Sequence, residues 1–272
     1  MSKFSVPANS QHEFSASPKH HQVGVFLNKS GNHVGLIYVK VSQQDVDGYA
    51  ASESDDDDDD IVTAADVDEQ KVQETWVLSL LNENLLEHEA RDIPSYRKQF
   101  FFAPCPLDHA NAIGFASVLN VVGRNQYRNI SFGLDWHGSL GSFTHDGRYT
   151  PPEKSLGLTC ASFVSELFAA RKLPIVKAET WEKDTPANKE WRDKKIDSWN
   201  AVETTRMALG DTKIAAHALL TPLMRLLPTE AAAAAEQKVA TSPPLDSANA
   251  GALGAKLLAE FEVAYPPPKK KG

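Results

Sequence analysis

The residue best suited to covalent chemistry in this sequence is Cys160, which lies where a turn meets an expected helix. Gly157 gives the turn backbone freedom, and Thr159 is a typical N-cap whose hydroxyl accepts a hydrogen bond from a helix N–H group. An apolar stripe with a 3.6-residue period predicts the helix, at Phe163, Val164, Leu167 and Phe168. The first turn of a helix favours an anion, so we expect the Cys160 thiol to ionise readily and to act as a nucleophile. The same N–H groups are suited to binding an oxyanion.

A cysteine nucleophile needs a base, and His33 is the best placed of the nine histidines. It follows a turn at residues 28–32 and opens an apolar strand, at one end of an expected sheet. The other histidines fall in or beside the N-terminal arm, or in expected loops and helices. Simpler alternatives stay open: Cys160 as a small buried residue that only packs, and His33 as a capping or surface residue.

The elements that must position these two residues are short strands and amphipathic helices. Apolar and β-branched runs predict four strands, at residues 23–27, 33–41, 74–81 and 99–104. Asp108 is placed to cap a helix that starts near His109, and the Cys160 helix should end near Arg171, before Pro174. The long connection at residues 123–156 is rich in glycine and aromatic residues, and we expect it to form a pocket wall.

The remaining segments divide the chain into further parts. We expect a flexible arm at residues 1–20, an acidic disordered insertion at 42–70 that contains Asp55–Asp60, and a flexible tail at 266–272. Helical patterns at residues 179–200, 202–220, 229–240 and 250–263 predict a helical extension over 176–265. We interpret this extension as a cover or a surface for a protein partner.

Composition excludes several classes of function. The chain has 272 residues and a net charge of −8, without a basic stripe, so nucleic acid is not the expected partner. Two cysteines indicate a reducing compartment, and no signal peptide or apolar run of about 18 residues is present. These features predict a cytoplasmic protein without a membrane span, although export without a cleavable signal stays open.

Cofactor and metal motifs are also missing from the sequence. There is no glycine-rich phosphate loop and no G-x-S-x-G turn. Cys105 and His109 are a close cysteine–histidine pair, but Pro106 between them disfavours a helical metal site. We therefore expect no cofactor and no metal.

Two motifs together resemble a known superfamily. A strand that opens with His-x-Gly-Leu-Ile-Tyr at His33, followed later by a helix headed by Thr-Cys-Ala-Ser-Phe-Val at Cys160, resembles the circularly permuted branch of the NlpC-type papain-like superfamily. Its layout is similar to that of lecithin retinol acyltransferase relatives and bacterial permuted amidases. The resemblance covers roughly residues 20–175 and implies an α+β fold, in which a small antiparallel sheet packs on helices and the cysteine begins a helix. It places this domain at residues 21–175.

The resemblance also implies roles for individual residues. Cys160 would be the nucleophile and His33 the general base, with a third residue on the next strand, near Leu80–Asn84. Bacterial relatives often carry a histidine there, whereas this chain offers Asn82, Glu83 and Asn84. All three can orient an imidazole ring.

These roles together predict a cysteine-dependent hydrolase. It would cleave an amide, peptide or ester bond through a thioester on Cys160. Two alternatives stay open: a catalytically inactive papain-like fold that serves as a protein-interaction module, and a thiol acyltransferase that acts on lipid.

Overall fold

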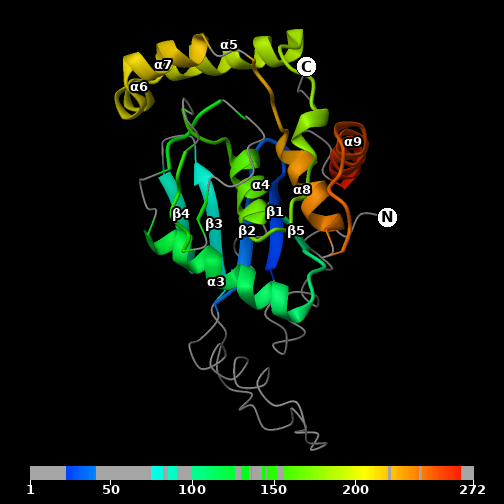
Figure 1. Ribbon diagram of the computed structural model, residues 1–272. Coiled ribbons are helices and arrows are strands. Elements are labelled where there is room, and N and C mark those ends of the chain that lie inside the picture. Colours follow the sequence, from blue (N-terminus) through cyan, green and yellow to red (C-terminus); the bar gives the residue numbers. More distant parts are fainter. Residues whose placement is uncertain are drawn as a thin grey trace, which may run out of the picture.

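The computed structural model has an α+β architecture, in agreement with the expected fold class at that level (Figure 1). Helices cover one face of a five-stranded antiparallel sheet, and a separate group of helices lies beyond one end of the strands. The structure describes residues 23–40, 75–81, 85–90, 100–125, 130–134, 136, 143–144, 146–151, 156–219, 222–238 and 241–264. The expected arm (1–20), acidic insertion (42–70) and tail (266–272) lie outside these residues.

The sheet has the strand order β4-β3-β2-β1-β5, and every neighbouring pair is antiparallel. Its strands are β1 (Val23–Asn28), β2 (Val34–Val39), β3 (Thr75–Leu81), β4 (Leu85–Ala90) and β5 (Phe100–Pro104). Four of them match the strands expected from apolar runs. The expectation that His88 lies in a loop or helix is wrong, because it lies in β4, whose two glutamates weaken the apolar signal of a strand.

The two faces of the sheet carry different side chains because successive strand residues point to opposite sides. On one face Val25, Leu27, Val34 and Leu36 join the main apolar cluster with the helices. On the other face a smaller buried cluster contains Phe26, Ile37, Val77 and Phe102. We call these the helix face and the opposite face.

The helix face is covered by α3 (His109–Asn125), α4 (Cys160–Ala170) and α8 (Pro228–Gln237). The α3 helix begins as expected, with Asp108 accepting a hydrogen bond from the Asn111 N–H at 2.9 Å. Five consecutive alanines, at residues 231–235, are all buried and allow α8 to pack closely on its neighbours. The last helix, α9 (Ser247–Ala264), packs on α8, and its Phe261 ring stacks on Phe101 of β5. α8 and α9 therefore belong to the same packed core as the sheet.

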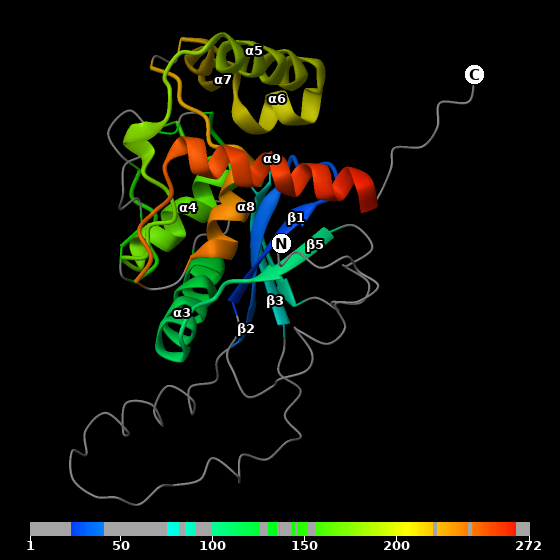
Figure 2. The same ribbon diagram turned by 90° about the vertical axis from the view of Figure 1, so that its right-hand side faces the viewer.

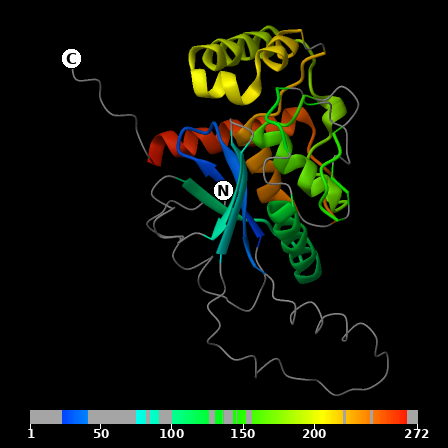
Figure 3. The ribbon, with the colours of Figure 1, turned by 90° about the vertical axis from the view of Figure 1, so that its left-hand side faces the viewer.

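The helices α5 (Pro186–Ala201), α6 (Glu203–Leu209) and α7 (Asp211–Ala218) form a separate group (Figure 2 and Figure 3). A short 3-10 helix, η1 (Ala178–Thr180), precedes them. The single helix expected at residues 202–220 is divided at Gly210, whose φ of +82° lies in the left-handed region. This group lies beyond the end of the sheet at which β2 begins and β3 ends. The Trp199 ring of α5 meets the Phe132 ring edge-on, with 6.1 Å between the ring centroids.

Candidate nucleophile site at Cys160

Cys160 is the first residue of α4, as the sequence predicts. Thr159 is the N-cap in an extended conformation, and its hydroxyl accepts a hydrogen bond from the Ser162 N–H at 3.1 Å. The Ser162 hydroxyl in turn accepts a hydrogen bond from the Thr159 N–H at 2.8 Å. This reciprocal capping box fixes the first turn of the helix and therefore the position of the cysteine.

The backbone before the helix needs a glycine. Gly157 has a φ of +137°, and a Cβ atom at this position would collide with the Ser131 carbonyl oxygen. The next residue, Leu158, exchanges backbone hydrogen bonds of 2.9 and 3.0 Å with Ser131 and Gly133. Leu158 thus anchors the chain between the turn and α4 to the segment at residues 131–133.

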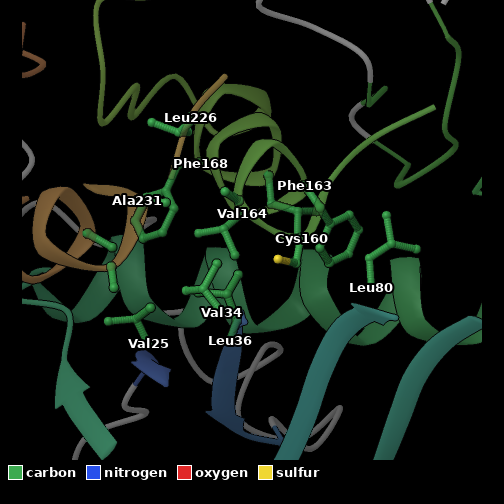
Figure 4. Close-up of a cluster of buried hydrophobic side chains, with 14 of the residues drawn as sticks. Val25, Val34, Leu36, Leu80, Cys160, Phe163, Val164, Phe168, Leu226 and Ala231 are labelled. Atoms are coloured by element: carbon green, nitrogen blue, oxygen red, sulfur yellow. The ribbon is translucent and has the colours of Figure 1, made fainter. Parts of the chain in front are cut away.

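The Cys160 side chain is buried, with a relative exposure of 7%. Figure 4 shows its sulfur pointing from α4 toward Val34 and Leu36 of β2. Burial raises the pKa of the Cys160 thiol, and it outweighs the backbone hydrogen bonds from Val34 and Ala161, which lower this pKa. The expectation of an easily ionised thiol is therefore wrong for this conformation, because desolvation is stronger than the effect of the helix N-terminus.

Sheet geometry explains why the Val34 N–H is available to the sulfur. The Asn28 N–H donates to the His33 carbonyl at 2.9 Å, so alternation directs the N–H and C=O of Val34 toward β3. The pairing of β2 with β3 extends from Val39 to Leu36 and stops before Val34. The Val34 N–H lies beyond this ladder, where it hydrogen-bonds to Cys160.

His33 directly precedes β2, so its backbone lies at the same end of the sheet as Cys160. Its ring, however, contacts Phe26, with 5.9 Å between the ring centroids, and Phe26 belongs to the opposite face. Burial lowers the pKa of His33 below its ordinary value, and the Glu87 carboxylate offsets only part of this shift. The buried Nε2 atom has no hydrogen-bond partner among the described residues. The structure thus brings the two predicted residues to one end of β2, with their side chains directed to opposite faces.

The three residues proposed to orient the base, Asn82, Glu83 and Asn84, lie outside the described residues. The structure adds another carboxylate, Glu87 of β4, which interacts with His33 and accepts a 2.7 Å hydrogen bond from the Ser79 hydroxyl. Sequence reasoning missed Glu87 because it missed β4. The alternation of glutamates with Leu86 and His88 was the available signal.

Two cations from the C-terminal region also interact electrostatically with Cys160. They are Lys195 of α5 and Arg225, which precedes α8. Lys195 lowers the pKa of the thiol. No sequence motif pointed to them, because their proximity to Cys160 depends on how the C-terminal helices pack.

The second cysteine has the opposite electrostatic surroundings. Cys105 follows β5 and is buried, and both burial and the nearby Glu236 carboxylate raise its pKa. Cys105 therefore provides an internal reference for the reactivity of Cys160. Across the described residues, no group of three or more His, Cys, Asp or Glu side chains is arranged to hold a metal ion.

No family model, curated protein or solved structure matches this chain. In the part of the chain that the structure describes, no helix combines the length and apolar character needed to cross a membrane.

Proposed function

We propose that this protein is a cysteine-dependent hydrolase of the circularly permuted papain-like kind, which cleaves an amide, peptide or ester bond. One observation carries the proposal: the Cys160 thiol lies at the N-terminus of α4 and hydrogen-bonds to the backbone N–H groups of Val34 and Ala161. N–H groups that stabilise a thiolate also suit the oxyanion that forms when sulfur attacks a carbonyl. Lys195 adds a positive charge near the same sulfur.

In the proposed reaction the Cys160 thiolate attacks the carbonyl carbon, and the bond to the leaving group breaks with transfer of a proton to that group. This step leaves a thioester on Cys160. Water then attacks the thioester, which releases a carboxylic acid and restores the thiol. His33 would accept the thiol proton first and later activate the water.

The general-base role requires the His33 ring to turn away from Phe26 toward Cys160. Its position supports this movement, because His33 lies between a turn and the first residue of β2. Its buried Nε2 has no hydrogen-bond partner within the described structure, so turning breaks no hydrogen bond at that atom. Asn82, Glu83 and Asn84 remain the proposed residues for orienting the turned ring, whereas Glu87 interacts with the ring in its observed direction on the opposite face.

The proposal is tested by trapping the thioester. The full chain is mixed with p-nitrophenyl acetate, quenched in acid and mapped by peptide mass spectrometry. We expect acetylation of Cys160 but not of Cys105, and slower acetylation in His33→Ala. A Cys160→Ala variant identifies background acetylation of lysines. The absence of an acetyl group on Cys160 would contradict the proposal.

A second function, as a protein-interaction module, is favoured by one group of residues. Large apolar side chains are exposed around α6 and α7, including Met207 at 74% and Leu219 at 81%. Exposed apolar groups of this kind are typical of interaction surfaces. If Cys160 forms no thioester while a Met207→Lys variant loses a partner that the wild type binds, the second function replaces the first.

A further inference from the structure

Two partly buried cations lie near Cys160, and neither forms an ion pair with a carboxylate among the described residues. Lys195 extends from α5, and Arg225 belongs to the segment between α7 and α8. Both interact electrostatically with the thiol of Cys160, and Lys195 also interacts with Arg225. Two segments from outside the sheet therefore bring positive charge to one place at the beginning of α4.

Neither cation forms an ion pair with any Asp or Glu in the described residues at N···O distances up to 4.0 Å. Cations of α5 and α6 do form such pairs, since Lys194 contacts Glu190 at 2.6 Å and Arg206 contacts Glu203 at 3.0 Å. The unpaired state of Lys195 and Arg225 is thus a local feature of the surroundings of Cys160.

The acidic group that interacts electrostatically with Arg225 is already engaged in hydrogen bonds. Glu230 interacts with Arg225 electrostatically, but its Oε2 accepts hydrogen bonds from the Leu227 N–H at 2.8 Å and from the Trp181 ring N–H at 3.4 Å. The Arg225 guanidinium instead lies over the Trp191 ring, 4.3 Å from its centroid. A cation–π contact of this kind helps to hold the guanidinium in place, and its N–H groups suit a planar anion.

Partial burial of two cations that form no ion pair costs free energy, and a negative ligand would offset this cost. A thiolate on Cys160 supplies one negative charge beside two cations, and the Glu230 carboxylate is held by its hydrogen bonds to Leu227 and Trp181. A negatively charged group on the substrate could therefore bind to both cations. A carboxylate matches the planar donor set of arginine, and lysine adds a point charge.

We propose that Lys195 and Arg225 form a subsite for a carboxylate of the substrate, next to the carbonyl attacked by Cys160. This inference rests on the proposed function and narrows its substrate class to amides, peptides or esters that carry a carboxylate near the cleaved bond. The subsite would bind the substrate and orient it, and the α5–α7 group would contribute to specificity through Lys195.

Two alkylating reagents of nearly equal size test the subsite. Iodoacetate carries a carboxylate, and iodoacetamide carries a neutral amide in its place. Both need the thiolate, so the ratio of their rates at Cys160 does not depend on the ionised fraction of the thiol. In the wild-type full chain we expect a higher iodoacetate-to-iodoacetamide rate ratio at Cys160 than for a free cysteine in solution.

The variants are Lys195→Gln, Arg225→Gln and the double substitution. We expect the ratio to fall by about tenfold in the double variant, because local positive charge concentrates anionic reagents. The matched control is Lys194→Gln, which removes an exposed cation one residue away and should leave the ratio unchanged. Lys195→Arg keeps the charge and should retain most of the ratio.

Each outcome separates the subsite from the proposed reaction. An unchanged ratio in the double variant, with circular dichroism like that of the wild type, would overturn the subsite even if the thioester forms. A charge-dependent ratio without a thioester would support the subsite and refute the hydrolase. Failure of both reagents to label Cys160 would overturn the subsite, since no substrate carboxylate could then reach it.

Discussion

The backbone N–H of Val34 hydrogen-bonds to the thiol of Cys160, which joins the first residue of β2 to the first residue of α4. These residues are far apart in the sequence, and the contact forms because β2 extends past its pairing with β3. The thiol therefore lies next to Val34, the residue that directly follows His33. Pairing of His33 with the thiol requires its side chain to turn, while the two backbone segments are already adjacent.

Loss of the helix cap should affect both stability and reactivity. In Thr159→Val the capping hydrogen bond to the Ser162 N–H is absent, and we expect unfolding free energy to fall by about 1 kcal/mol in urea denaturation. Alkylation of Cys160 should also slow, because its helix turn is less well held. Thr159→Ser keeps the hydroxyl and should resemble the wild type. Equal stability of the valine and serine variants would show that the cap contributes little.

Gly35 of β2 should not tolerate a side chain. A Cβ atom there would collide with the Phe26 ring and with Cβ of Ser79 on the opposite face. We expect Gly35→Ala to lower the unfolding free energy by about 2–3 kcal/mol, as overpacking of a filled core does.

Gly251 in α9 provides the control for this substitution. A Cβ atom there meets only Glu230 Oε1 at 3.7 Å, an ordinary contact. Gly251→Ala should therefore stabilise the protein slightly, because alanine favours a helix. A Gly35→Ala variant as stable as Gly251→Ala would show that β2 can shift away from Phe26.

His88 should make stability depend on pH below neutrality. It accepts or donates a 2.7 Å hydrogen bond with the Tyr38 hydroxyl, and burial together with Arg124 and Lys40 lowers its pKa to about 4. The unfolded chain, with a pKa near 6.5, therefore binds more protons between these values, and stability falls as pH decreases from 6.5 to 4. Because His88 is only half buried, we expect a loss of about 1–2 kcal/mol from this residue.

Urea denaturation at pH 7 and at pH 4.5 measures the effect of His88. His88→Gln keeps a partner for Tyr38 and should show a smaller loss of stability between these pH values than the wild type. Substitution of the exposed His109 by Gln provides the control. Equal pH dependence in wild type and His88→Gln would contradict this assignment.

The parts of the fold that the sequence predicted have strong local patterns. Four strands are apolar runs, and α3 and α4 each combine a capping residue with an apolar stripe. β4 was missed because Glu87 and Glu89 alternate with its apolar residues. The break at Gly210 was missed because a single glycine within a helical pattern does not reveal its φ.

The candidate site was predictable only where local sequence determines it. Thr159 and Cys160 belong to one helix start, so their arrangement follows from neighbouring residues. The direction of the His33 ring depends on strand register, and the approach of Lys195 and Arg225 depends on how distant helices pack. The balance between burial and the helix N-terminus, which sets the pKa of Cys160, also requires the packed structure.

The most direct test of the central claim is the pH dependence of Cys160 alkylation by iodoacetamide, in wild type and in His33→Ala, with Cys105 as the internal reference. If His33 turns and pairs with the thiol, wild-type Cys160 should react at pH 6, below the free-thiol pKa of about 8.5, while Cys105 does not. His33→Ala should lose the reaction at pH 6 and keep it at high pH. If Cys160 reacts only above the free-thiol range in both proteins, burial alone controls it and the catalytic pair is contradicted.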